Sequence, residues 1–136
     1  MASAPLTLRR WTRVEYERLV DLGAFEGDPV ELIGGQLYVA EPQNSPHATA
    51  AGAADDTLRA ALPEGFIVRA QMPIALGDDS APEPDLVVVP GRRADYRIAH
   101  PTSAALVIEV ADSSLEFDRN EKGSLYAHAQ IAEYWT

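Results

Sequence analysis

Residues 82–89 have the sequence PEPDLVVV and place Asp85 between a proline and an apolar run. Polar segments rich in proline are typical of loops, and a short continuous apolar run predicts a strand that is buried on both faces. A carboxylate at the start of such a strand is unfavourable unless it has a partner. The stretch therefore predicts a central strand at 85–89, with Asp85 as either a solvent-facing residue that starts it or a functional residue.

A second apolar run, AALVIEV at 104–110, carries Glu109 near its end. If the two strands are adjacent and antiparallel or staggered, the carboxylates of Asp85 and Glu109 meet at one edge of the sheet. Like charges at that distance need a cation or a proton between them. Carboxylate oxygens with water suit magnesium or manganese. The alternative for Glu109 is a salt bridge with an arginine such as Arg69.

Capping and turn signals predict the N-terminal elements. Thr12 followed by Glu15 forms a capping box. The dipeptide Gly34-Gly35, between two apolar runs, suits a tight hairpin turn. We therefore expect a short helix from 12 to about 23 and a hairpin with strands at 30–33 and 36–40.

The rest of the chain alternates between apolar runs and turn signals. Ser45 as N-cap and Pro46 at the first helical position predict a helix that reaches Leu62, where Pro63 stops it. We also expect strands at 66–70 and 73–76, a surface connection at 91–103, a helix at 118–129 and the start of another strand at 131–136.

This order of elements predicts an α/β fold with a mixed central sheet flanked by helices. A chain of 136 residues matches the size of one domain, so we expect a single domain over 1–136. The sequence stops inside an apolar segment, and the strand that begins there would lack its remainder. We therefore expect this domain to be truncated at its C-terminus.

Composition excludes several classes of protein. The chain has no cysteine, which excludes disulfide frameworks, thiolate zinc sites and cysteine nucleophiles. It has no signal-peptide pattern and no run of membrane-spanning length, so we expect a soluble cytoplasmic protein without membrane contact. The net charge of −10 argues against strong sequence-independent binding of DNA over a large surface. The basic cluster of Arg92, Arg93 and Arg97 is either a solvated loop or a phosphate contact.

Phosphodiester hydrolysis needs a metal ion and a positive side chain that stabilises the transition state. A lysine two residues after Glu109 would share its side of the strand, but that position holds Ala111. Lys122 is the only lysine in the chain, and on the predicted helix it shares one side with Asp118 and Tyr126. Lys122 is therefore either the missing cation or a solvated residue paired with Asp118.

These motifs together resemble the Uma-two family of restriction endonuclease-like proteins, in the PD-(D/E)XK nuclease superfamily. The likeness runs from about residue 12 to the C-terminus and rests on VELIGGQLYVA, SPHATA, PEPDLVVV and LVIEVADSSLEFDRNEKGSLYAHAQIAEYW. The resemblance implies a restriction-endonuclease-like three-layer core, a divalent metal and frequent self-association. Members of the family continue past the final Tyr-Trp with another hairpin.

By this resemblance Pro84-Asp85 matches the family's P-D motif, Glu109 matches its second acid, and Lys122 matches a lysine moved to the following helix. Glu31 and His47 match the hairpin glutamate and the helix histidine. The alternatives are an outward-facing strand charge for Glu31 and a surface or packing residue for His47.

The sequence thus predicts a Mg²⁺- or Mn²⁺-dependent endonuclease that acts on nucleic acid, with DNA as the expected substrate and a homodimer as a possible assembly. Asp85, Glu109 and the backbone carbonyl of Val110 are the expected metal ligands, with Glu31 as a further one. Lys122 is expected to orient the attacking water or offset developing charge. His47 and Tyr126 are secondary candidates, although Tyr126 also suits simple packing. The alternative function is a catalytically inactive nuclease fold that serves as a binding or assembly module.

Overall fold

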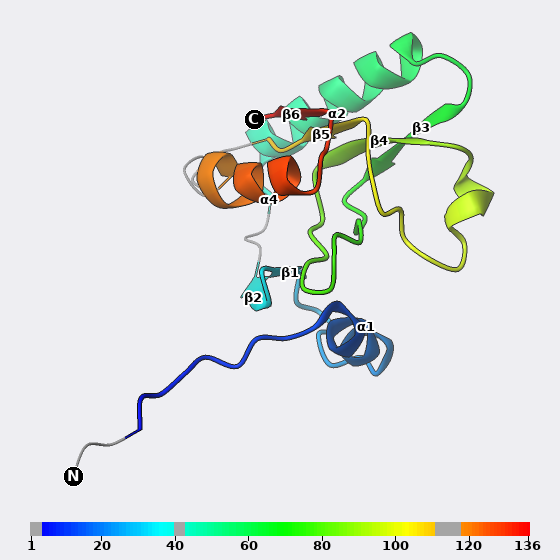
Figure 1. The fold of residues 1–136 in the computed structure, drawn as a ribbon. Helices are drawn as coiled ribbons and strands as arrows, with labels where there is room; N and C mark the ends of the chain where they lie inside the picture. Colours follow the sequence, from blue (N-terminus) through cyan, green and yellow to red (C-terminus); the bar gives the residue numbers. More distant parts are fainter. Residues whose placement is uncertain (1–3, 40–42, 111–117) are drawn as a thin grey trace.

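The computed structural model describes residues 4–39, 43–110 and 118–136. A four-stranded sheet lies between helices, and a separate hairpin packs with the N-terminal helix (Figure 1). The elements are α1 Arg13–Asp21, β1 Val30–Ile33, β2 Gln36–Val39, α2 Ser45–Ala61, β3 Phe66–Ala70, β4 Leu86–Pro90, the 3₁₀ helix η1 Arg93–Tyr96, β5 Leu106–Ile108, the π-helical turn η2 Asp118–Lys122, α4 Gly123–His128 and β6 Glu133–Trp135.

The sheet is mixed, as the sequence predicts. Its strand order is β3-β4-β5-β6. Strand β4 is antiparallel to both β3 and β5, and β6 runs parallel to β5. Leu86 at the start of β4 lies opposite Ile108 at the end of β5. Asp85 directly precedes β4 and Glu109 directly follows β5. Because these two strands are antiparallel, both acids lie at the same edge of the sheet.

Side chains alternate between the two faces of β4 and pack against a different helix on each. Val87 and Val89 belong to a core with Tyr126 of α4. Leu86 and Val88 belong to a second core, which Leu58 of α2 covers. Helices α2 and α4 lie on opposite sides of the sheet (Figure 1). The expected three-layer fold is confirmed, and the continuous apolar run is explained by burial on both faces.

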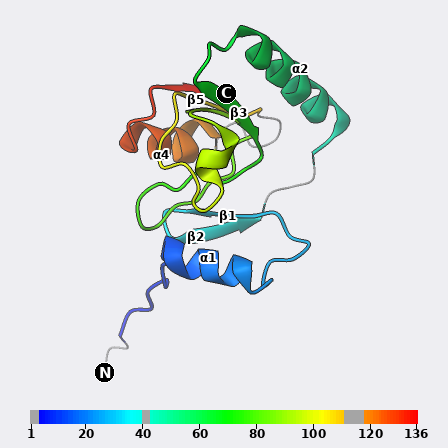
Figure 2. The same cartoon turned by 90° about the vertical axis from the view of Figure 1, so that its right-hand side faces the viewer.

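A third, smaller core joins α1 to the hairpin, and these elements lie together at one end of the molecule (Figure 2). The capping box of Thr12 and Glu15 is present as predicted. The hairpin turns through Gly34 and Gly35, which have φ of 59° and 80°, a conformation that glycine adopts without strain. Leu32 is fully buried and bridges to Ala81, just before the PEPD segment. The hairpin is thereby attached to the chain that leads into β4.

The apolar stretch at 73–76 is not a strand, so that prediction is wrong. Its amide groups donate hydrogen bonds to carbonyl oxygens in two separate segments, 80–82 and Pro101, instead of one neighbouring strand. Ile74 and Leu76 are buried in the core on the α4 side of the sheet. The apolar pattern therefore reflects burial of an irregular segment, which periodicity cannot distinguish from a short strand.

Two element boundaries also differ from the prediction. The N-cap of α2 is Asn44, whose side chain accepts a hydrogen bond from the amide of His47 at 2.9 Å, so Ser45 is the first helical residue. Strand β5 is shorter than 104–110, although the amide of Glu109 still donates to the carbonyl of Trp135. The predicted strand at the end of the chain is confirmed as β6. No helix in the described segments has the length and hydrophobicity needed to cross a membrane.

Tyr16 of α1 gives a testable consequence of the small core. Its hydroxyl donates a hydrogen bond to the carbonyl of Val30 at 2.7 Å. Burial raises the pKa of Tyr16 to about 12, and repulsion from Glu83 adds to the rise. Because the folded pKa lies above the unfolded value of about 10, this group lowers stability as pH rises from 10 to 12, by up to about 1.4 kcal/mol per pH unit.

We expect Tyr16→Phe to cost about 1 kcal/mol at pH 7, through the lost hydrogen bond, and to remove part of the alkaline loss. Urea denaturation at pH 7 and pH 11 measures both effects. The exposed Thr7→Ala variant serves as a control and should match the unmodified protein at both pH values. An equal alkaline loss in Tyr16→Phe and in the unmodified protein would contradict the assignment.

Candidate active site

Asp85 lies where β4 begins, and its carboxylate is held by two other elements. Its Oδ2 accepts a hydrogen bond from the amide of Val110 at 2.7 Å and lies 3.1 Å from Nε2 of His47. Its side chain is 13% exposed. His47 comes from the first turn of α2, where Asn44 caps the helix. Asp85 is therefore fixed beside the backbone that directly follows Glu109.

Lys122 lies between two buried carboxylates. Its Nζ is 3.1 Å from Oε2 of Glu31 and 3.1 Å from Oε1 of Glu109. The three side chains are only 6%, 10% and 5% exposed, respectively. Tyr126, one helical turn after Lys122, donates its hydroxyl to the same oxygen of Glu109 at 3.0 Å. The cluster thus joins the hairpin, the sheet and the C-terminal helix through one ammonium group.

The electrostatics of this cluster keep Lys122 charged. Burial lowers the pKa of Lys122, but attraction to Glu109 and Glu31 outweighs burial and raises the pKa above its usual value. Burial also raises the pKa of the Tyr126 hydroxyl well above its usual value, and the charge of Glu109 raises it further. At neutral pH Lys122 is therefore a fixed positive charge, and Tyr126 is a hydrogen-bond donor.

Glu83 belongs to the surroundings of this cluster. Its amide donates to Oε1 of Glu31 at 3.0 Å, and its side chain is half-buried. Burial raises the pKa of Glu83, and repulsion from Glu31 adds to the rise. The two buried prolines that flank it, Pro82 and Pro84, hold this segment against the core.

The carboxylates fall into two sets, one around Lys122 and one around His47. Among the described residues, no three His, Asp or Glu side chains form a group that could hold a metal ion. Magnesium, however, commonly takes only one or two protein carboxylates and completes its shell with water and substrate phosphates. Oδ1 of Asp85 accepts no hydrogen bond from the described residues. The donor set of Asp85, Glu109 and the Val110 carbonyl therefore has suitable chemistry for magnesium.

The structure brings together most of the residues that the sequence singles out. Glu109 pairs with Lys122 and not with Arg69, whose contacts lie elsewhere. Ala111, at the position of the missing lysine, lies outside the described residues, as does the side chain of Asp118.

Two features were not foreseen from the sequence. One is the contact between His47 and Asp85. The other is the proximity of Glu83 to Glu31. The alternation of proline and acid at 82–85 is a signal that could have suggested a buried extended segment.

The arrangement defines a class of protein: a three-layer α/β fold with paired acids and a lysine at one edge of its central sheet. The chain belongs to the Uma2 family, whose model is described as "Putative restriction endonuclease" and matches residues 13–136.

A solved structure gives a separate comparison of the fold. A crystal structure from Anabaena variabilis, described as a "putative nuclease belonging to DUF820", matches with a TM-score of 0.59 and 15% sequence identity. The match covers 74% of this chain and 59% of that chain. At this identity the likeness establishes the fold alone. A search of the curated proteins finds no match.

Proposed function

We propose that the chain is a metal-dependent endonuclease that hydrolyses phosphodiester bonds of DNA, with Mg²⁺ or Mn²⁺ as cofactor. The observation that carries this proposal is the position of Asp85 and Glu109 at one edge of adjacent strands, with the ammonium of Lys122 3.1 Å from Glu109. Membership of a family described as "Putative restriction endonuclease" supports the choice of DNA.

Asp85, Glu109 and the backbone carbonyl of Val110 would hold the ion, and Glu31 is a further candidate ligand. A bound divalent ion polarises a phosphoryl oxygen and makes water a stronger nucleophile at neutral pH. The hydrogen bond from the Val110 amide fixes Asp85 relative to the backbone beside Glu109. His47 acts as a positioning residue for the same carboxylate.

Lys122 and Tyr126 contribute charge and orientation. Burial lowers the pKa of Lys122, but attraction to Glu109 and Glu31 outweighs it and raises the pKa. Lys122 therefore acts as a cation and not as a general base. Its positive charge offsets the negative charge that develops on the phosphoryl group. Tyr126 donates to Glu109 and so fixes the carboxylate oxygen on which Lys122 also acts.

The test is cleavage of supercoiled plasmid DNA in the presence of Mg²⁺ by the unmodified protein and by Asp85→Asn. We expect the variant to be at least about 100-fold slower, because it removes one charged ligand at the place where transition-state charge is stabilised. The amide keeps the size of the side chain, so the fold is retained. Nicked and linear products on agarose gels measure the rates.

Asp56→Asn is the matched control, since Asp56 is exposed on α2. It should cleave at the rate of the unmodified protein. Equal rates for the two variants would refute the assigned site. Failure of the unmodified protein to cleave with either Mg²⁺ or Mn²⁺ would instead favour a binding module, which the net charge of −10 and the pairing of Lys122 with Glu31 and Glu109 also suit.

A further inference from the structure

Arginines gather along β3, at one edge of the sheet. Nη2 of Arg59, from the last turn of α2, and Nη2 of Arg93, from η1, each lie 3.5 Å from the carbonyl oxygen of Val68. Two guanidinium groups thus share one neutral acceptor. Arg59 also pairs with Asp55 at 2.6 Å. A guanidinium has five N–H donors, more than these contacts use.

Arg69, the next residue of β3, is a buried cation without a carboxylate partner among the described residues. Only 7% of it is exposed, and its Nε is buried without a hydrogen-bond partner. Its Nη2 lies 3.4 Å from the carbonyl of Pro73 and 3.4 Å from Nδ1 of His100. The guanidinium lies over the ring of Tyr96 at 5.4 Å. A buried charge in such surroundings is unfavourable without a counter-ion, so the site is suited to an anion.

Local charge around β3 differs from that of the whole chain. Strand β3 and the segment 91–100 together contain four arginines and one acid, Asp95. Asp95 is occupied by the amide of Arg92 at 2.8 Å. We name as the arginine edge the exposed arginines Arg59, Arg92, Arg93 and Arg97. In a chain with 21 acids and 11 cations, this is a distinct basic surface.

The strand register relates the arginine edge to the candidate active site. Arg69 lies opposite Val87 and Val68 opposite Val88, whereas Asp85 directly precedes β4. Along β4, Asp85 is two residues from the partner of Arg69 and three residues from the partner of Val68, which is roughly 7–10 Å. Phosphates along one strand of duplex DNA follow each other with a rise of about 3.4 Å. A DNA strand with one phosphate at Asp85 therefore brings its next few phosphates to the arginine edge.

We propose that the arginine edge binds backbone phosphates of duplex DNA next to the phosphodiester held at Asp85. This inference rests on the proposed function, since it places the same substrate on the surface. It explains how a strongly acidic protein binds a polyanion: the contact is confined to one edge of the sheet. The charge of the buried Arg69, which the chemistry at Asp85 does not use, adds to the positive potential of this edge.

The experiment measures binding of a fluorescently labelled DNA duplex by anisotropy, in EDTA, over a range of NaCl concentrations. The variant is Arg93→Ala/Arg97→Ala, because both residues are exposed and their loss leaves the core intact. Each lost phosphate contact lowers the slope of log affinity against log salt by about 0.9. We expect a slope smaller by up to about 1.8 and an affinity roughly tenfold or more weaker at 0.1 M NaCl.

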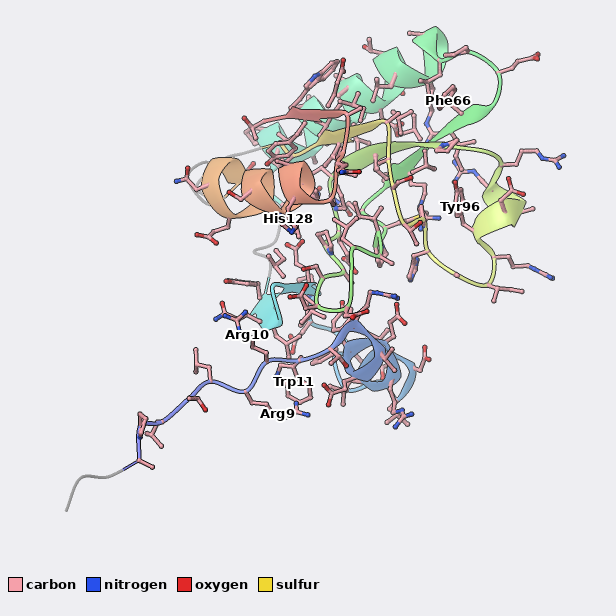
Figure 3. All side chains as sticks on the ribbon, in the orientation of Figure 1. Arg9, Arg10, Trp11, Phe66, Tyr96 and His128 are labelled. Atoms are coloured by element: carbon pink, nitrogen blue, oxygen red, sulfur yellow. The ribbon has the colours of Figure 1, made fainter. Side chains whose placement is uncertain are left out.

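The matched control is Arg9→Ala/Arg18→Ala, which removes the same charge from the N-terminal segment and α1. Arg9 lies on the N-terminal segment, well apart from Tyr96 (Figure 3). The control should keep the slope of the unmodified protein, and Arg93→Lys/Arg97→Lys should keep most of it because the charges remain. Equal slopes for the two alanine pairs would overturn the arginine edge while leaving the proposed function intact. Loss of plasmid cleavage in Asp85→Asn tests that function separately.

Discussion

Replacement of Lys122 by methionine is expected to lower the free energy of unfolding at pH 7 by about 3–5 kcal/mol. Methionine fills a similar volume, so the loss comes from charge and not from a cavity. Without the ammonium, the carboxylates of Glu31 and Glu109 remain buried beside each other with no cation between them. Urea denaturation followed by circular dichroism measures the change. Plasmid cleavage should be lost as well.

The charge-balanced variant Lys122→Met/Glu31→Gln/Glu109→Gln distinguishes this explanation from a general loss of packing. It should recover most of the stability and none of the cleavage, because the buried charges are gone and so are the groups proposed for chemistry. A triple variant that is as unstable as the single variant would contradict the electrostatic account. Arg18→Met, at an exposed site, should change stability by less than about 0.5 kcal/mol.

Replacement of Leu32 by alanine should cost about 3–5 kcal/mol, the upper part of the range for a fully buried leucine. Leu32 is fully buried in the core between α1 and the hairpin and bridges to Ala81. It also follows Glu31 directly, so a cavity there loosens the strand that carries this carboxylate. We therefore expect weaker plasmid cleavage together with the lower urea midpoint.

Leu37→Ala is the control for this prediction, since Leu37 is the partner of Leu32 across the hairpin but only half-buried. Its cost should be about 1–2 kcal/mol, because less apolar surface leaves water when it folds. If both substitutions cost the same, burial of Leu32 is not what attaches the hairpin to the sheet.

Local signals in the sequence predict much of the fold. The capping box at Thr12, the paired glycines of the hairpin and the apolar run after Asp85 each depend on neighbouring residues, so they can be recognised without coordinates. The stretch at 73–76 shows where this reasoning fails. Its residues are apolar because they fill the core, and its amide groups bond to two different segments instead of one neighbouring strand.

The candidate site was accessible to sequence reasoning only in part. Asp85 and Glu109 stand out because charges are unusual beside buried strands, and Lys122 because it is the only lysine. The link between Lys122 and Glu31 spans 91 positions, and no local pattern indicates it. The arrangement of His47 over Asp85 likewise depends on how α2 crosses the sheet. Such contacts follow from tertiary packing and not from periodicity.

The position of Lys122 between two carboxylates constrains how this protein can change over evolutionary time. A substitution of the lysine alone leaves two buried anions without a cation between them, whereas a substitution of one glutamate leaves a neutral ion pair. A viable change of Lys122 therefore requires changes at the glutamates as well. We expect the residue at position 122 to covary with the hairpin and strand residues at positions 31 and 109 among relatives of this chain.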